Sequence, residues 1–559
     1  MSVFDFITLF LTLGMIIFWG VYKTRSQKGL DGFLKGKEMS WATIGLSVMA
    51  TQASAITFLS TPGQGYASGM EFVQNYFGLP LAMIAVCTVF IPLYHRHKVF
   101  SAYQLLEDRF DKRSRYLGSF LFLLQRGLAA GITLYAPSII LTQVMGWNFN
   151  VVLLGAGIAV IFYTISGGTQ AVYVTHRHQM TVIFAGMIFV FGLVVFKLNQ
   201  FSSFSESLHI AGALGKMTIV DYSLDPGKKY TIWTGLIGGF FLALSYFGTD
   251  QSQVQRYLGG RSTAQSKIGM IFNALLKVPM QFMILLLGVL VFVFYLWNSP
   301  PATFFPVNLE DGDPRVMEVQ QAHSEQKVAA QNFVEALRAE DATARAESRE
   351  QLKQAHEDYL EKQQSFVIDV KAKYGFEKAK ESDYVFLNFI RTQLPIGMVG
   401  LLIAVIISAA MSSTASELNA LSTISTVDFY QNLFVKHADK KHYIMASRLF
   451  TAGWGGVAII FAFFIKSQNN LIESVNIIGS LFYGSVLGLF LTAFFFHWIR
   501  GTAVFLGTIA AQTVVLISYS LGNGSIGYLW YNFIGCGLVL IFSSLFQLFL
   551  KKDSPAKRL

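Results

Sequence analysis

The chain has 559 residues, of which 53% are hydrophobic and only 14% are charged. This composition excludes an ordinary soluble domain, because apolar stretches of about 20 residues, the length that spans a bilayer core, recur along nearly the whole sequence. The net charge of +10 does not indicate a nucleic-acid partner, because the basic residues lie in short segments between apolar stretches. We therefore expect a lipid bilayer, and no nucleic acid, around this protein.

We expect an all-α integral membrane protein with about thirteen membrane-spanning helices. The first apolar stretch has no preceding basic region and no small-residue cleavage site, so we expect a retained span and not a signal peptide. The expected spans are residues 3–22, 41–66, 72–95, 117–145, 149–168, 180–199, 231–249, 270–297, 386–427, 444–465, 471–497, 501–521 and 528–550.

The basic residues predict the orientation of the spans. If the N-terminus lies outside, the cytoplasmic segments hold roughly 24 Lys and Arg and the short outer loops about 5, which is the positive-inside asymmetry. These segments include "KTRSQKGLDGFLKGK", "RYLGGRSTAQSK", "VKHADKKHYIMASR" and the tail "KKDSPAKRL". We expect a multi-pass protein of a cell membrane, the bacterial inner membrane, with a cytoplasmic C-terminus.

Two spans carry residues that weaken a helix. The second contains "SVMATQASAITFLSTPGQGYASGM", and the seventh contains Gly235, Gly238 and Gly239. Interrupted spans at corresponding positions of two halves are typical of inverted-repeat transporters, with spans two to six and seven to eleven as the five-helix repeats. The alternative is that these glycines serve close helix packing.

A polar insert separates the eighth and ninth spans. It is rich in Ala, Glu, Lys, Gln and Arg, and Leu352, Tyr359 and Phe366 recur at seven with Val370 following. This pattern predicts a helical hairpin that starts near Pro314 and turns near 338–344; a solvated tether is the alternative. We expect three parts: spans one to eight in 1–297, an extracytoplasmic insert with an unknown partner in 298–385, and spans nine to thirteen with the tail in 386–559.

The ninth span is unusual because it carries eight Ser and Thr hydroxyls between Ser412 and Thr426. Most are expected to bond back to a carbonyl one turn earlier. The Ala409 carbonyl and the hydroxyls of Ser412 and Ser413, however, can face one patch and supply oxygens to a hard cation. Further oxygens could come from carbonyls freed around "ATQAS" in the second span.

Five segments, in this order along the chain, resemble motifs of the sodium/solute symporter family. They are "SAITFLSTPGQGYASG", "FSAYQLLEDRF", "FYTISGGTQAVYVTH", "GTDQSQVQRYLGGRS" and "SSTASELNALSTISTVDFY". The resemblance covers spans two to nine and not the polar insert. It implies a LeuT-type core of two inverted five-helix repeats behind one leading helix, and sodium as the coupling ion.

The same resemblance implies roles for single residues. The sodium ligands would be Ala50, Ala53, Ala409, Ser412 and Ser413, and the inner gate Tyr246. The chain has His176 where family members often carry an aspartate on the inward sodium route, which removes the carboxylate of a second sodium site. The alternative is that His176 belongs to a basic cytoplasmic loop.

Other polar residues lie inside the spans. Arg126 is expected to pair with Asp250 or Glu417, or to contact substrate, and Lys277 to reach the membrane surface from its span. A midplane pocket is expected to include Gln52, Thr57, Gln74, Asn75 and Tyr76. Sugar transporters of the family carry an amide and a carboxylate where this chain has Thr57 and Tyr76, so the resemblance favours the monocarboxylate, vitamin and iodide branch.

The sequence thus predicts a sodium-coupled symporter that imports a small solute, with a small organic anion or carboxylate favoured. A symporter for a sugar or another neutral solute is an alternative. So is a sensor or scaffold that uses the external hairpin. No pore-loop signature indicates a channel, and no nucleophile, phosphate-loop or metal motif indicates an enzyme.

Overall fold

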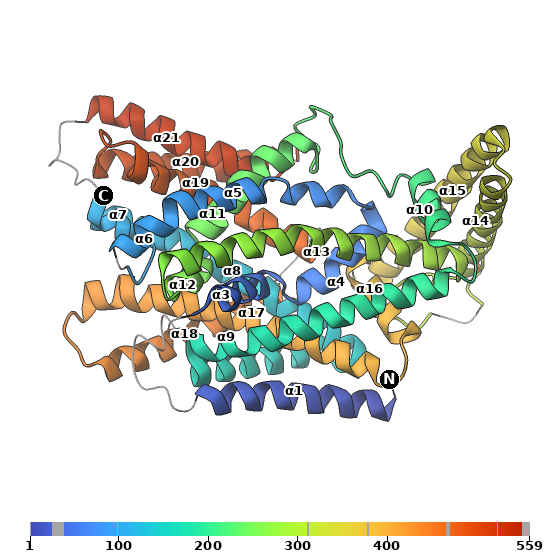
Figure 1. Cartoon of the computed structure of the whole chain (residues 1–559), viewed down its shortest axis with the longest axis horizontal. Helices are drawn as coiled ribbons and strands as arrows, with labels where there is room; N and C mark the ends of the chain where they lie inside the picture. Colours follow the sequence, from blue (N-terminus) through green and yellow to red (C-terminus); the bar gives the residue numbers. More distant parts are fainter. Residues whose placement is uncertain are drawn as a thin grey trace.

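The computed structural model describes residues 2–24, 39–97, 99–309, 312–376, 379–464, 470–522 and 524–550. This part of the chain is almost entirely helical, and its helices run mostly along one long axis (Figure 1). In chain order they are α1 (Val3–Thr24), α3 (Trp41–Gln52), α4 (Ala55–Ser68), η1 (Glu71–Tyr76), α5 (Leu79–Ala85), η2 (Val86–Phe90), α6 (Ile91–His97), α7 (Gln104–Arg109), α8 (Lys112–Met145), α9 (Phe149–Leu198), α10 (Phe204–Ala213), η3 (Thr234–Gly238), α11 (Gly239–Gly248), α12 (Gln251–Leu258), α13 (Thr263–Trp297), α14 (Pro314–Arg338), α15 (Ala342–Tyr374), α16 (Ser382–Gln393), α17 (Met398–Ile424), η4 (Ser425–Phe434), α18 (Lys440–Phe464), α19 (Leu471–Phe495), α20 (Gly501–Leu521) and α21 (Trp530–Phe549).

The helices agree with the expected membrane fold. Within the described residues, 10 helices are long and apolar enough to cross a bilayer, and 11 if the bent pair α3–α4 counts as one span. The expected first and seventh spans correspond to shorter apolar segments, Val3–Met15 in α1 and Thr234–Gly248 in η3 and α11. The start of α1 lies at one end of the long axis and the end of α21 at the other (Figure 1).

Interruptions between helices follow α3 and α11, one in each predicted repeat. The axis bends by 61° between α3 and α4, at Ala53 and Ser54, which confirms the break predicted around "ATQAS". The expected seventh span, 231–249, ends with α11 at Gly248, and the short helix α12 begins after Thr249 and Asp250. Each break frees backbone groups that a membrane interior cannot hydrate, so polar side chains gather there.

Two expectations about helix boundaries are wrong. The ninth span, expected as 386–427, is divided into α16 and α17, because Pro395 forces Leu394 into an extended conformation and Gly397 has a φ of +89°. The loop expected between the fifth and sixth spans is instead helical, since both spans, Phe149–Ser166 and Gln179–Leu198, lie within α9.

The glycines of the seventh span serve close packing, which was the alternative interpretation. A Cβ atom at Gly235 would lie 2.1 Å from the Gln74 carbonyl oxygen, and one at Gly239 would lie 2.8 Å from that of Asn75. The start of this span therefore lies directly against η1.

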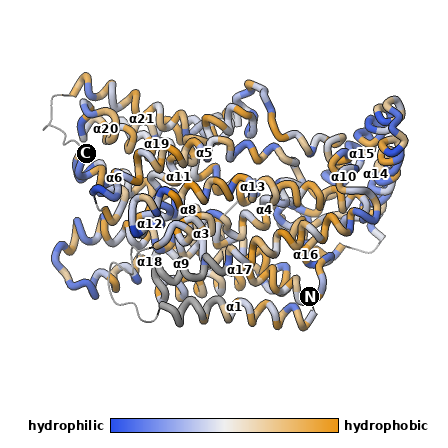
Figure 2. The backbone as a smooth tube through the Cα atoms, in the orientation of Figure 1, coloured by the Kyte–Doolittle hydropathy of each residue, from blue (hydrophilic) through white to orange (hydrophobic). Residues whose placement is uncertain are grey.

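The polar insert forms the predicted helical hairpin. α14 begins at Pro314 and pairs with α15, and the turn falls at Ala339–Asp341, where Glu340 has a φ of 55°. The expected seam is buried: Leu352, Tyr359, Phe366 and Val370 all lie in one hydrophobic cluster with residues of the apolar helices. Figure 2 shows the hairpin as the largest hydrophilic projection from an otherwise largely hydrophobic bundle.

Candidate functional site

A cavity of about 140 Å³ lies beside the break between α3 and α4. Its walls come from α3, α4, η1, α5, α8, α11, α13, α17 and α19, so both predicted repeats contribute. The lining side chains that can bond a polar solute are Thr51, Gln52, Ser54, Thr57, Asn75, Tyr76, Arg126, Thr133, Tyr246, Lys277, Glu417, Asn476 and Tyr483.

Most residues expected at a midplane pocket line this cavity. Gln52 donates to the Asn273 side chain at 3.1 Å, and Thr57 donates to the carbonyl oxygen of Gln52 at 3.0 Å across the helix break. The hydroxyl of Tyr76 accepts from Gln281 at 2.9 Å, and that of Tyr246 accepts from Gln253 at 2.6 Å. These bonds fix the orientation of the aromatic and amide groups on the cavity wall.

Gln74 is not among the lining residues. Its amide nitrogen donates to the carbonyl oxygens of Glu71 and Tyr230, both at 3.3 Å, and its oxygen accepts from the Asp221 N–H at 3.1 Å. The residue therefore ties η1 to the segment that precedes η3. The Asn75 oxygen, by contrast, has no hydrogen-bond partner among the described residues.

Arg126 of α8 lies in a buried charge cluster with both predicted partners. It is paired with Asp250 and, at 3.1 Å, with Glu417 of α17. Thr133 donates to the other Glu417 oxygen at 2.7 Å, and Tyr483 donates to Asp250 at 2.9 Å. A buried charge in a membrane needs such partners, so both carboxylates hold the guanidinium in place at the cavity wall.

Lys277 departs from expectation. It lies well inside α13, is 2% exposed and lines the cavity, with its ammonium 5.7 Å from the centre of the Tyr76 ring. No carboxylate pairs with it among the described residues. The expected span 270–297 began too late, since α13 starts at Thr263, and this error placed Lys277 near a helix end. A charge in the middle of a 35-residue helix was the signal that could have identified it.

The hydroxyls of α17 mostly bond within their own helix, as predicted. Thr414 and Ser416 donate to the carbonyl four residues earlier, at 3.0 and 2.8 Å, and Ser422 and Thr423 both donate to the Asn419 carbonyl. These four therefore need no ligand to be satisfied.

Ser413 differs because its hydroxyl approaches a backbone carbonyl oxygen of another helix, whereas Thr414 and Ser422 approach hydroxyls, those of Thr133 and Ser447. Its hydroxyl lies 3.0 Å from the Ala409 carbonyl oxygen and 3.4 Å from the Ala50 carbonyl oxygen of α3. The Ser413 hydroxyl thus lies within 3.4 Å of two of the other four oxygens expected around sodium. Of the other two residues, Ala53 caps the end of α3 at the break, and Ser412, which precedes Ser413, is buried in α17.

His176 is fully buried inside α9, so it is not part of an exposed basic loop. Its Nδ1 lies 3.2 Å from the Ser47 hydroxyl of α3, and its Nε2 has no partner among the described residues. Three residues on, Gln179 donates to the carbonyl and hydroxyl oxygens of Ser408 at 3.3 and 2.6 Å. α9 therefore contacts both helices that carry the expected sodium ligands, and sequence reasoning had not identified Gln179.

Curated relatives come from several transport systems. The chain is 30% identical over 265 residues to mouse sodium-coupled monocarboxylate transporter 2 and 30% identical over 287 residues to the human sodium/iodide cotransporter. These matches cover 47% and 51% of this chain but only 42% and 44% of the relatives, so the chain spans less than half the length of these two. The rabbit sodium-dependent multivitamin transporter is 25% identical over 94% of this chain and 71% of its own length.

A solved structure has the same fold over the whole chain. It is titled "Substrate-bound outward-open state of a Na+-coupled sialic acid symporter reveals a novel Na+-site", and the match has a TM-score of 0.78 at 24% identity and covers 100% of both chains. This likeness confirms the expected all-α, LeuT-type fold class.

The model of the sodium:solute symporter family matches residues 33–312 and 364–510. The unmatched residues, 313–363, comprise α14, the turn after it and the first two thirds of α15, so most of the hairpin lies outside the part that the family model matches. The match contains every residue of the cavity wall and all five segments in which the resemblance was found. The chain therefore belongs to the sodium:solute symporter family, a family of transporters and not of enzymes.

Proposed function

We propose that this protein is a secondary active symporter that imports a small organic anion together with sodium by alternating access. The observation that carries the anion assignment is the unpaired ammonium of Lys277 on the cavity wall. Arg126 is already neutralised by Asp250 and Glu417, so Lys277 is the cation that a carboxylate can meet. Burying an unpaired charge is costly, and an incoming carboxylate removes that cost.

The charges around the cavity agree with one sodium and one monoanion. Lys277 and Arg126 balance Asp250 and Glu417, so the two solutes together leave the site neutral. A neutral sugar with one sodium would instead leave a net positive charge in a buried site. The family's relatives that carry monocarboxylates, iodide and vitamins support an anion further.

We propose Ala50, Ala53, Ala409, Ser412 and Ser413 as the sodium ligands. Carbonyl and hydroxyl oxygens suffice for a hard cation, and the approach of the Ser413 hydroxyl to Ala50 and Ala409 supports this set. The site would join α3, which bends at the cavity, to α17. Sodium could then hold the broken helix in the conformation that binds the solute.

We infer that the N-terminus and the hairpin α14–α15 lie outside and the C-terminus in the cytoplasm of a bacterial inner membrane. The Lys and Arg asymmetry supports this orientation, and so does the position of α1's start at the hairpin end of the bundle (Figure 1).

Uptake into proteoliposomes tests the proposal. We expect inward sodium-driven uptake of one or more short monocarboxylates, a carboxylate vitamin, sialic acid or iodide, and none of glucose. Lys277→Gln should lower anion uptake by at least about tenfold, since a hydrogen bond to a charged group is worth roughly 1.5–3 kcal/mol. Lys197→Gln is the matched control, because Lys197 bonds Gln393 outside the cavity. Sodium-driven glucose uptake that is insensitive to K277Q would contradict the anion assignment.

A further inference from the structure

The beginning of α1 is joined to the beginning of α17 by a buried carboxylate. Oδ1 of Asp5 accepts from the Gly397 N–H at 2.6 Å and lies 3.4 Å from the Gly400 nitrogen. Its Oδ2 accepts from the Ser2 N–H and hydroxyl, at 2.9 and 2.8 Å. Asp5 is 3% exposed, so this carboxylate serves as the cap of a helix to which it does not belong.

α17 needs such a cap because it has none of its own. Its N-cap residue is Gly397, which has no side chain, and Pro395 precedes it. The first N–H groups of a helix have no partner within it, and a negative charge there is favourable to the helix dipole. Whereas Asp5 accepts hydrogen bonds, the Thr8 hydroxyl of α1 donates one, to the Gly397 carbonyl at 3.1 Å.

The contact also fixes how far α17 extends along α1. A Cβ atom at Gly400 would lie 1.9 Å from the Asp5 carbonyl oxygen and 2.3 Å from the Thr8 hydroxyl. The two backbones therefore meet at a point where only glycine fits. A shift of α1 along α17 would therefore also break the hydrogen bonds of the Asp5 carboxylate to Gly397 and Gly400.

α17 carries the proposed sodium oxygens farther along the same helix. Ala409 and Ser413 follow Gly400 by about 13–20 Å at a rise of ~1.5 Å per residue. A helix transmits an axial shift at one end to the other, and the Ser413 hydroxyl has to stay within reach of Ala50 on α3. Metal and ion sites lose affinity when the elements that hold their ligands are loosened.

We propose that Asp5 is a positioning residue for the sodium site: it caps α17 from the leading helix and holds its oxygens in register with the break of α3. This inference rests on the proposed sodium ligands. In this inference α1, the helix outside the two predicted repeats, contributes to transport by holding α17 in position.

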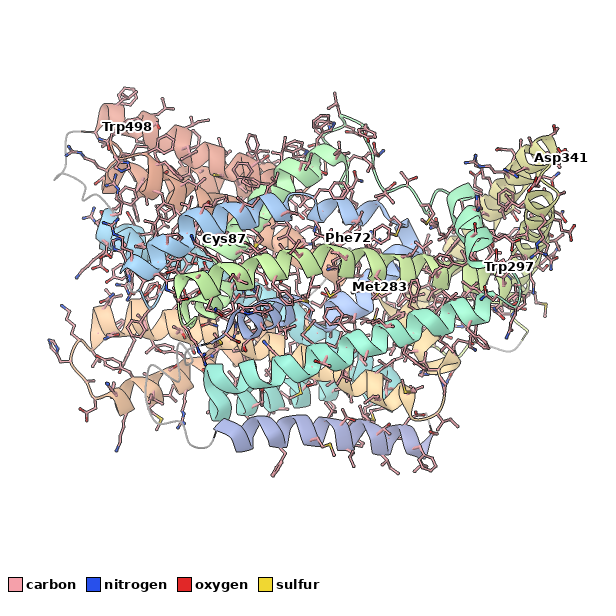
Figure 3. The ribbon with its side chains drawn as sticks, viewed as in Figure 1. Phe72, Cys87, Met283, Trp297, Asp341 and Trp498 are labelled. Atoms are coloured by element: carbon pink, nitrogen blue, oxygen red, sulfur yellow. The ribbon has the colours of Figure 1, made fainter. Side chains whose placement is uncertain are left out.

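The test compares Asp5→Ala, Asp5→Asn and Thr8→Val with Asp341→Ala. Asp341 is the matched control, because it caps α15 by accepting from the Thr343 and Ala344 N–H groups at 2.9 and 3.1 Å. It lies at the tip of the hairpin, far from the sodium helix (Figure 3). Sodium titration of initial uptake gives the half-saturating sodium concentration and the maximal rate for each inserted variant.

We expect D5A to raise the half-saturating sodium concentration by about threefold or more, which matches the loss of a helix cap. D5N keeps a hydrogen-bond acceptor without the charge, and T8V loses only the bond from Thr8 to the Gly397 carbonyl. Both variants should therefore raise the half-saturating sodium concentration by less than D5A does. The maximal rate at saturating sodium should stay within about twofold, and D341A should match the wild type. A purely structural role would lower the amount of inserted protein or the maximal rate and leave the sodium dependence unchanged.

The inference is overturned if D5N, T8V and any inserted D5A all show wild-type sodium dependence, or if D341A shifts it equally. Ser413→Ala, measured in parallel, separates this failure from failure of the proposed function. If the half-saturating sodium concentration shifts in S413A but not in the Asp5 variants, only the positioning role of Asp5 is rejected. Unchanged sodium dependence in S413A rejects the sodium ligands themselves.

Discussion

The hydroxyl of Ser413 lies 3.4 Å from the carbonyl oxygen of Ala50, on a helix 363 residues earlier in the chain. The contact joins the two proposed repeats at the break of the second span. A sodium ion held by the ligands proposed above would contact both α3 and α17, so its binding would depend on the relative position of these helices.

Ser413→Ala should weaken sodium binding without unfolding the protein. Alanine favours a helix, and only one of about five proposed oxygens is lost, so we expect the half-saturating sodium concentration to rise by roughly tenfold. Ser416→Ala is the matched control, since its hydroxyl bonds only to the Ser412 carbonyl of its own helix. Uptake by S413A with wild-type sodium dependence would remove Ser413 from the ligand set.

The hairpin α14–α15 should be dispensable for sodium-driven transport. It supplies no residue to the cavity wall, and the family model does not match it up to residue 363. The replacement should be limited to 314–374, because Glu381 accepts from the Thr303 hydroxyl and the Phe304 N–H at 2.6 and 2.7 Å. We expect retained uptake with a lower melting temperature, because the hairpin covers apolar residues of the main cluster.

The control for that experiment is Arg338→Ala, which breaks only the exposed pair with Glu206 at 2.8 Å and should change neither property measurably. If the shortened protein inserts normally and sodium-driven uptake disappears, the hairpin is part of the transport machinery.

Asp383 should make the protein less stable as the pH rises. It lies in the first turn of α16, outside the candidate spans, and burial raises the pKa of its carboxyl from 3.8 to about 7, although Ser60 and the Leu471 N–H lower it. A carboxyl with a raised pKa contributes stability that is fully present below pH 3.8 and is lost as the pH rises through about 7. Nearby Glu473 adds to this effect and Lys380 opposes it.

Melting temperatures in detergent between pH 5 and pH 9 test this prediction. We expect the wild type to lose stability over the range and Asp383→Asn to lose less, because an amide does not ionise. Glu381 is the neighbouring buried carboxyl, and its pKa is also raised by burial, so Glu381→Gln serves as the comparison. Identical pH profiles for D383N and the wild type would contradict a neutral Asp383 in the folded protein.

The sequence predicted the features that follow from local chemistry. The break at Ala53 and Ser54, the start of α14 at Pro314, the buried seam of α15 and the pairing of Arg126 each follow from residue types that leave few alternatives. The division at Pro395 and Gly397 was visible in the same way and was overlooked because hydropathy continues across it.

The features that the sequence did not predict depend mostly on tertiary packing. Gln74 is next to Asn75 in sequence, but the close contact at Gly235 turns it toward the segment before η3 and away from the cavity. The Asp5 cap was missed because it depends on which helix lies opposite, and hydropathy does not contain that information. Lys277, by contrast, was missed because the expected span began too late.

The last prediction concerns stoichiometry: one sodium accompanies one monoanion in each cycle. The resemblance places a carboxylate of a second sodium site at the position of His176, and here that position holds a buried imidazole whose Nδ1 faces the Ser47 hydroxyl at 3.2 Å. A neutral imidazole offers a hard cation nitrogen instead of anionic oxygen, and a protonated one repels it.

Sodium titration of initial anion uptake should therefore give a Hill coefficient near ~1, the value for a single coupled site. The cycle then moves no net charge, so a membrane potential imposed with potassium and valinomycin should change the rate little, although each uncompensated charge would contribute roughly 2.3 kcal/mol per 100 mV. Changing His176 to Asp supplies the missing carboxylate and should raise both the coefficient and the response to potential, whereas His176→Asn, which has a similar shape and no charge, should raise neither. A wild-type coefficient near ~2, with inward current during anion uptake, would mean that a second sodium binds without a carboxylate at this position.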